Sequence, residues 1–97
     1  MALSVIMDQT KYKQKLEIGV DREANPILIL QDWDHRDYIE DVLCEHYDIE
    51  YEYMVEDEIS GSNTLYFGTK ISAESLQGVI EKINEHHATK KELYNVV

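Results

Sequence analysis

Cysteine and proline each occur only once in this chain of 97 residues, and there are four glycines. The lone Cys44 cannot form a disulfide within the chain, so a reducing compartment fits it best. No run approaches the roughly twenty apolar residues of a membrane-spanning helix. The opening MALSVIM is too short for a secretory signal and lacks its basic start. These absences predict a soluble, cytoplasmic protein.

Basic residues are scarce where acidic residues are most frequent. Between Asp32 and Glu58 there are twelve acids and one base, Arg36, so this acidic segment has a charge of −11, equal to the formal net charge of the whole chain. A strongly acidic chain disfavours direct binding to nucleic acid or to anionic membranes, because the phosphates would be repelled. The charge favours a cationic partner, or serves solubility alone.

Recognisable constellations for catalysis or metal binding are also lacking. Neither H-x-x-x-H nor C-x-x-C spacing occurs, and the adjacent His86 and His87 would point about 100° apart on a helix. The acidic segment lacks the central glycine and regular D-x-D-x-D spacing of a calcium-binding EF-hand loop. No glycine-rich phosphate loop is present, and the acids beside Cys44 disfavour its thiolate. We therefore expect no enzymatic activity, cofactor or metal, although a pair of catalytic carboxylates stays open.

Apolar periodicity predicts two strands in the first third of the chain. Residues 15–20 alternate between apolar and polar types, which is typical of a half-buried strand. The apolar run 27–30 predicts a central strand covered on both faces. The loop 21–26, which contains the only proline, joins these strands in antiparallel order. A further short strand at residues 2–7 is an open alternative to a frayed terminus.

A helix is predicted to begin at Asp34, a good N-cap, with Asp37 completing an arrangement like a capping box. Its buried face is predicted to contain Tyr38, Ile39, Val42, Leu43 and Tyr47. The opposite face contains Asp37, Glu40, Asp41, Cys44, Glu45 and Asp48. The outer face of this helix is therefore almost wholly anionic.

The second half predicts a hairpin followed by a second helix. Residues 49–57 and 64–71 both alternate, and the loop 58–63 joins them. On the first of these strands, one face would carry Ile49, Tyr51, Tyr53 and Val55 and the other Glu50, Glu52, Met54 and Glu56. Ser72 is the predicted cap of a helix that ends near His87 and buries Leu76, Val79, Ile80 and Ile83. Residues 89–97 would either dock on the domain as a short helix or strand, or fray from it.

Together these elements predict one domain, residues 1–97, of the α+β class. The expected architecture has two layers, with an antiparallel or mixed sheet of four to five strands and two helices packed on one face.

The acidic segment is the candidate partner-binding surface. Neighbouring glutamates on one strand face lie about 7 Å apart and repel by about 0.6 kcal/mol in bulk water. Retaining this repulsion on helix and strand favours a partner that relieves it, and a merely solvated face is the alternative. Trp33 is equally suited to the core or to an interface. The candidate partner-binding residues are Trp33, Asp37, Glu40, Asp41, Glu45, Asp48, Glu50, Glu52 and Glu56.

A small acidic α+β chain with QDWDHRDYIEDVLCEHYDIEYEYMVEDE as its charged centre resembles bacterial immunity proteins, above all the immunity partners of contact-dependent growth inhibition toxins. The resemblance is one of size, charge and layout over the whole chain. It implies a cytoplasmic protein that binds one cognate cationic toxin domain, often a nuclease, and covers its active site. The alternatives are a phage-type nucleic-acid mimic that inhibits a defence nuclease, and a small regulatory domain with a solubilising acidic face.

Overall fold

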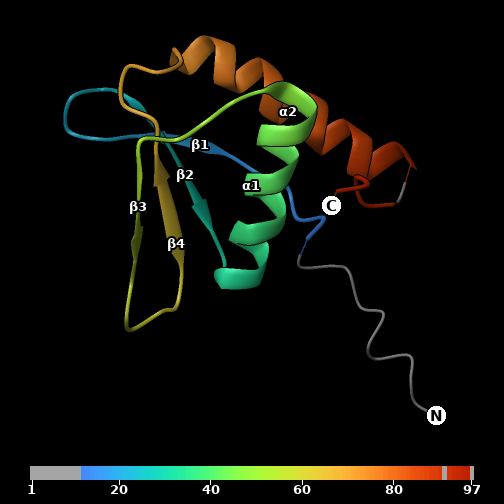
Figure 1. The fold of residues 1–97 in the computed structure, drawn as a ribbon, viewed down its shortest axis with the longest axis horizontal. Helices are drawn as coiled ribbons and strands as arrows, with labels where there is room; N and C mark the ends of the chain where they lie inside the picture. Colours follow the sequence, from blue (N-terminus) through green and yellow to red (C-terminus); the bar gives the residue numbers. More distant parts are fainter. Residues whose placement is uncertain (1–11, 91, 97) are drawn as a thin grey trace.

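The computed structural model describes residues 12–90 and 92–96, so the strand predicted at 2–7 lies outside the described residues. Its elements are β1 (Ile18–Val20), β2 (Pro26–Leu30), α1 (Trp33–Tyr47), β3 (Tyr53–Glu56), β4 (Asn63–Tyr66) and α2 (Ala73–Lys90). The predicted order of two strands, a helix, two strands and a helix is confirmed (Figure 1).

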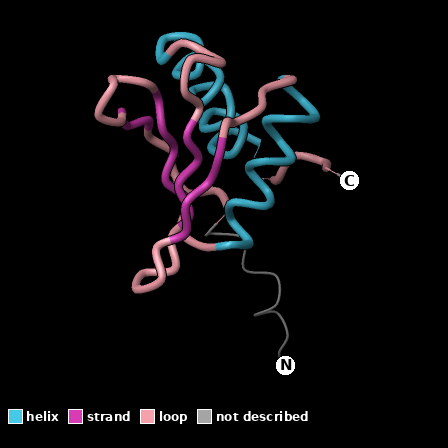
Figure 2. The backbone as a smooth tube through the Cα atoms, turned by 60° about the vertical axis from the view of Figure 1, so that its left-hand side comes forward, coloured by secondary structure: helices cyan, strands magenta, loops and turns pink. Residues whose placement is uncertain are grey.

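The four strands form one antiparallel sheet in the order β1-β2-β4-β3. The predicted hairpin of β3 and β4 is present, and β2 joins the two hairpins by pairing with β4. Both helices lie on the same side of the sheet (Figures 1 and 2). The predicted α+β architecture is therefore confirmed, with four strands in the described part of the chain.

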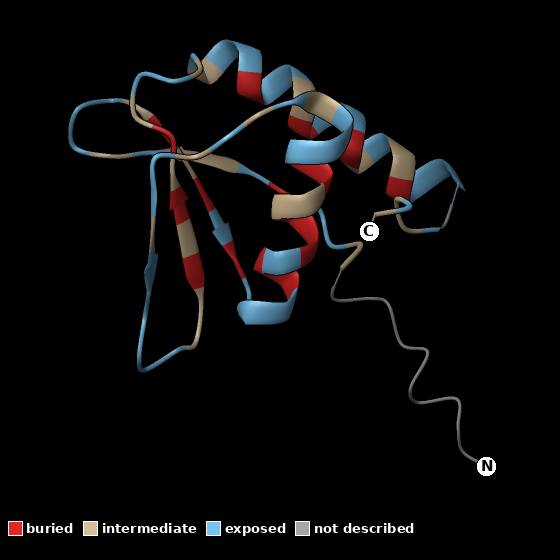
Figure 3. Cartoon of the chain, viewed as in Figure 1, coloured by how far each residue is buried: buried red, intermediate tan, exposed pale blue. Residues whose placement is uncertain are grey.

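The core lies between the sheet and the two helices, where the helical stripes meet the inner sheet face. Its buried apolar residues are Leu16, Leu28, Leu30, Tyr38, Ile39, Val42, Leu43, Leu65, Phe67, Leu76, Ile80 and Ile83. The predicted helical stripes are confirmed, with Tyr47 and Val79 half-buried at their margins. On α2 the buried positions face the sheet, and β3 is mostly exposed (Figure 3).

Two predictions about strand faces were wrong. The central strand β2 is covered on one face only, because both helices pack on the same side, and Ile29 is 59% exposed. On β3 the faces are reversed: Met54 packs against the core, while Tyr53 and Val55 are 51% and 46% exposed. Antiparallel pairing places Met54 opposite the buried Leu65 and therefore turns its neighbours outward.

Several predicted boundaries also shift. The N-cap of α1 is Asp32, which has an extended backbone and whose Oδ1 accepts the His35 amide at 3.0 Å, so the cap lies two residues before the predicted cap Asp34. At the start of α2, Ser72 Oγ accepts the Ser75 amide at 3.1 Å, as predicted. This helix continues to Lys90, beyond the predicted end, and buries His87.

The strands are shorter than their alternating patterns. The residues between Asp48 and Glu52 form no strand, because Asp48 ends α1 in the left-handed conformation (φ 56°) and the chain must then turn back to the sheet. Strand β4 ends at Tyr66, shortly before Gly68, which also has a positive φ of 56°.

Residues 92–96 return to the helices as irregular chain. The Tyr94 amide donates to the Tyr38 hydroxyl at 2.8 Å, and the Tyr47 and Tyr94 hydroxyls are 2.9 Å apart. The His86 ring stacks on Tyr94 with centroids 3.9 Å apart. In residues 12–90 and 92–96 there is no helix with the length and apolar character needed to cross a membrane.

Candidate functional site

The outer face of α1 carries a row of carboxylates. Asp37, Asp41 and Glu45 occur at intervals of four residues, so they lie one above another on the helix, about 6 Å apart along its axis. The same helix turns its apolar side to the sheet, which fixes the direction of this row. Asp37 and Glu45 are exposed, and Asp41 is half-buried between them.

Burial and mutual repulsion both act on the pKa of Asp41. Partial burial raises this pKa above its ordinary value, and the charges of Asp37, Glu45 and Glu40 raise it further in that order. The Arg36 guanidinium acts in the opposite direction but does not reverse the shift. At Asp41, burial and the neighbouring carboxylates therefore outweigh the charge of Arg36.

Glu40 differs from the other predicted acids because it has two partners within the fold. Arg36 Nη1 donates to Glu40 Oε1 at 2.5 Å, and the Tyr51 hydroxyl donates to Glu40 Oε2 at 2.5 Å. Arg36 is buried and also donates from Nε to Asn63 Oδ1 at 3.3 Å. The bond to Glu40 is the first cause of the raised pKa of Tyr51. Glu40 thus joins α1 to the segment after it and is poorly placed to meet a partner.

The turn at Asp48 brings Glu50 beside the helix. A hollow of about 290 Å³ is lined by Glu40, Cys44, Ile49, Glu50 and Tyr51, so residues from both segments surround one space. A second hollow of about 430 Å³ lies at the C-terminal end of α1. It is lined by Asp48, Ile49, Glu50, Lys70 and Ile71. Together these segments form the acidic surface, which consists of Asp37, Asp41, Glu45, Asp48 and Glu50.

Glu52 and Glu56 do not continue the acidic surface as a row of side chains on one strand. Glu52 precedes β3, and its carboxylate lies over Gly68, where both oxygens are 2.6 Å from the position a Cβ would occupy. Glu56 ends β3, four residues later and about 13 Å away along the chain. It pairs in register with Asn63, which contacts Arg36 near the beginning of α1.

Trp33 is the first residue of α1, so it lies at the end of the helix opposite Asp48. Its side chain is 56% exposed, and the Arg36 guanidinium carbon is 5.2 Å from the centroid of its ring, a cation–π contact. The tryptophan is therefore outside the core. The length of α1, about 22 Å, separates Trp33 from Asp48.

The sequence did not predict the outer sheet face, the side of the sheet opposite the helices, because it assigned the two faces of β3 the wrong way round. It consists of Ile27, Ile29, Tyr53, Val55, Thr64 and Tyr66. The signal that would have found it is Met54: if this residue faces the core, Tyr53 and Val55 must face outward. A hollow of about 650 Å³ opens on this face.

Metal binding receives no geometric support within the described ranges, where no group of three or more histidine, cysteine or acidic side chains is arranged to hold an ion. Comparison with protein-family models, with curated proteins and with solved structures found no match.

Proposed function

We propose that this protein binds a basic protein through its acidic surface and neutralises it, as an immunity protein does for a toxin. The observation that carries the proposal is the row of carboxylates Asp37, Asp41 and Glu45 on the outer face of α1, where burial and the charges of the neighbouring acids raise the pKa of Asp41. A cationic partner relieves that repulsion, so part of the binding energy is already stored in the free protein.

A nuclease domain is the partner class that best fits this chemistry. A nuclease must attract phosphates, so its active-site cleft is basic. The carboxylates of α1 and Glu50 would occupy the positions of phosphates, and their charge would accelerate encounter with the cleft. The role is binding and not catalysis, and it places the protein in the cytoplasm beside its partner.

The test compares two matched charge reversals. Asp41→Lys with Glu45→Lys alters the acidic surface, whereas Glu81→Lys with Glu85→Lys makes the same change at the same spacing on the exposed face of α2. Glu40 is left intact because its reversal would break the contacts to Arg36 and Tyr51. The partner is captured from the native host with the wild-type protein, purified, and assayed for inhibition and for binding kinetics.

We expect wild-type association of about 10⁸ M⁻¹s⁻¹ at low salt, slowing steeply as salt rises. The α1 reversal should slow association by at least about tenfold and abolish inhibition, and the α2 reversal should leave both near wild type. If the α1 reversal binds and inhibits like the wild type, the acidic surface is only solvated and the proposal fails.

A further inference from the structure

The outer sheet face is an apolar surface that the fold leaves uncovered. Both helices pack on the opposite side, so Ile29, Tyr53 and Val55 remain about half exposed among Ile27, Thr64 and Tyr66. These residues come from three neighbouring strands and form two rows across the sheet. A contiguous apolar patch on a small acidic domain marks an interaction site.

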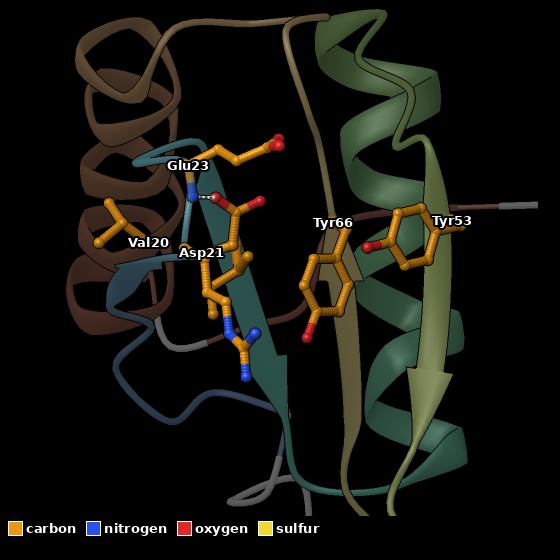
Figure 4. A pocket seen from close by; sticks show the side chains of 7 residues that line it. Val20, Asp21, Glu23, Tyr53 and Tyr66 are labelled. Atoms are coloured by element: carbon orange, nitrogen blue, oxygen red, sulfur yellow. Dashed lines mark hydrogen bonds between the residues drawn. The ribbon is translucent and has the colours of Figure 1, made fainter.

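At one end of this face the sheet is hollowed. The hollow of about 650 Å³ is lined by Val20, Asp21, Arg22, Glu23, Ile27, Tyr53 and Tyr66. Its floor contains the Tyr53 and Tyr66 rings, stacked with centroids 4.6 Å apart and planes 5° apart. Figure 4 shows the loop between β1 and β2 on one side, with the Glu23 side chain extending toward the strands that carry the tyrosines.

Two carboxylates face the tyrosines from that loop. Asp21 Oδ1 accepts the amide of Glu23 at 2.8 Å (Figure 4) and that of Asn25 at 3.0 Å, and these bonds hold the loop in place. Partial desolvation raises the pKa of Tyr53, and the charges of Tyr66, Asp21, Glu52 and Glu23 raise it further. The carboxylates therefore act on the same space that the aromatic rings line.

Aromatic rings opposed by carboxylates match the chemistry of a guanidinium group. Arginine stacks its plane on an aromatic ring and donates paired hydrogen bonds to a carboxylate. A second copy of this chain is a poorer occupant, because each copy has a charge of −11 and would bring the same carboxylates to the contact. Charge complementarity thus selects a basic partner.

We propose that the outer sheet face is a second docking surface, and that its hollow accepts an arginine side chain from a basic protein between the tyrosine pair and the carboxylates of Asp21 and Glu23. That this basic protein is also the partner of the acidic surface rests on the function proposed above. The arginine site does not depend on that function. Arg22 also lines the hollow and is exposed, so its positive charge opposes a second guanidinium in the same space.

The experiment is an NMR titration of the isotope-labelled full chain with the peptide acetyl-Gly-Arg-Gly-amide. The matched probe contains citrulline, which has nearly the same shape but no charge. We expect saturable shifts at Ile27, Tyr53 and Tyr66 with the arginine peptide, and binding at least about tenfold weaker with citrulline. Equal shifts with both peptides, no shifts, or shifts confined to the acidic surface would overturn the proposal.

Three variants sharpen this test. Tyr66→Leu keeps the apolar contact with Ile27 but removes the ring, and should weaken arginine binding about threefold to fivefold. Glu23→Gln should also weaken binding, whereas Arg22→Gln should strengthen it by removing a competing charge. Asp41→Asn on α1 should have no effect on this peptide. Weakening by Asp41→Asn equal to that by Glu23→Gln would indicate non-specific charge attraction and contradict the site.

The two proposals fail separately. If Tyr66→Leu leaves binding of the purified partner unchanged while the α1 reversal abolishes it, the partner uses the acidic surface alone. If Tyr66→Leu weakens partner binding and the α1 reversal is silent, the docking surface stands and the acidic surface does not. Sedimentation of the free protein is the remaining check, because a dimer that buries the outer sheet face would assign this face to self-association and overturn the proposal.

Discussion

At the scale of single residues, His87 links the two helices to the end of the chain. The Tyr94 amide donates to the Tyr38 oxygen at 2.8 Å, so the Tyr38 hydroxyl hydrogen is free to be donated to His87 Nε2, also 2.8 Å away. The other ring nitrogen, Nδ1, is buried and has no hydrogen-bond partner in the described part of the chain. This environment favours the neutral imidazole.

Acid should therefore weaken the fold through His87. Burial is the largest cause that lowers its pKa from 6.5 to about 4, followed by the charges of His86, Lys13 and His35. The unfolded chain binds a proton near pH 6.5 and the folded chain only near pH 4, so stability from this group is lost as the pH falls through that window. Between pH 7 and pH 5 the loss should be about 2 kcal/mol.

Urea unfolding at both pH values measures this loss, and His87→Gln should reduce its size. His46→Gln, which changes an exposed histidine, is the control and should retain the wild-type dependence. An unchanged pH dependence in His87→Gln would contradict the assignment to His87.

At the scale of an element, α1 has one side packed in the core and an outer side whose carboxylates repel one another. Asp32 caps its beginning, Arg36 and Glu40 pair along it, and Asp48 closes its end. In the row through Asp41, burial and the charges of Asp37, Glu45 and Glu40 raise the pKa of Asp41. The helix is therefore held by its core contacts and caps in spite of its surface charge.

Asp41→Asn should stabilise the protein at pH 7. Two like-charged pairs at i, i+4 are removed, with Asp37 and with Glu45, and together they cost about 0.5–1 kcal/mol. Because the folded pKa of Asp41 is raised, the wild-type penalty is present at neutral pH and is released as the pH falls through that pKa, so the advantage of the variant should shrink in acid. Thermal unfolding of the variant and of Glu85→Gln on α2 checks this. A variant less stable than wild type at pH 7 would show that Asp41 has a compensating contact.

At the scale of the whole molecule, negative charge lies on both sides of the sheet. The acidic surface and the carboxylates around the outer sheet face belong to different sides of one small sheet domain. Basic residues elsewhere in the chain balance only the remaining acids. Long-range repulsion is therefore a property of the folded state as a whole.

Moderate salt should stabilise the isolated protein. Folding brings the carboxylates together, and salt screens their repulsion over a Debye length of about 8–10 Å. The melting temperature should rise between low salt and about 0.3 M ionic strength. A fall, or no change, would mean that the acids are already paired within the fold.

The sequence by itself determined the elements and the location of the charge. The stripes containing Ile39 and Ile80 specify two amphipathic helices, because period 3.6 leaves one direction for burial. The acids of α1 then face solvent by the same geometry. The α+β class follows from two such helices, three alternating segments and one apolar run, since the apolar side of each helix must be covered.

Tertiary structure decided which face of each strand is covered. On β3 the tyrosines and Met54 are all able to be buried, so alternation alone leaves two equivalent assignments. The choice is made by distant contacts: Asp48 turns the chain, Tyr51 binds Glu40, and Met54 pairs with Leu65. Those same contacts turn Tyr53 outward beside Tyr66. A residue's side of the sheet is a property of register between strands, and register is set only when the strands meet.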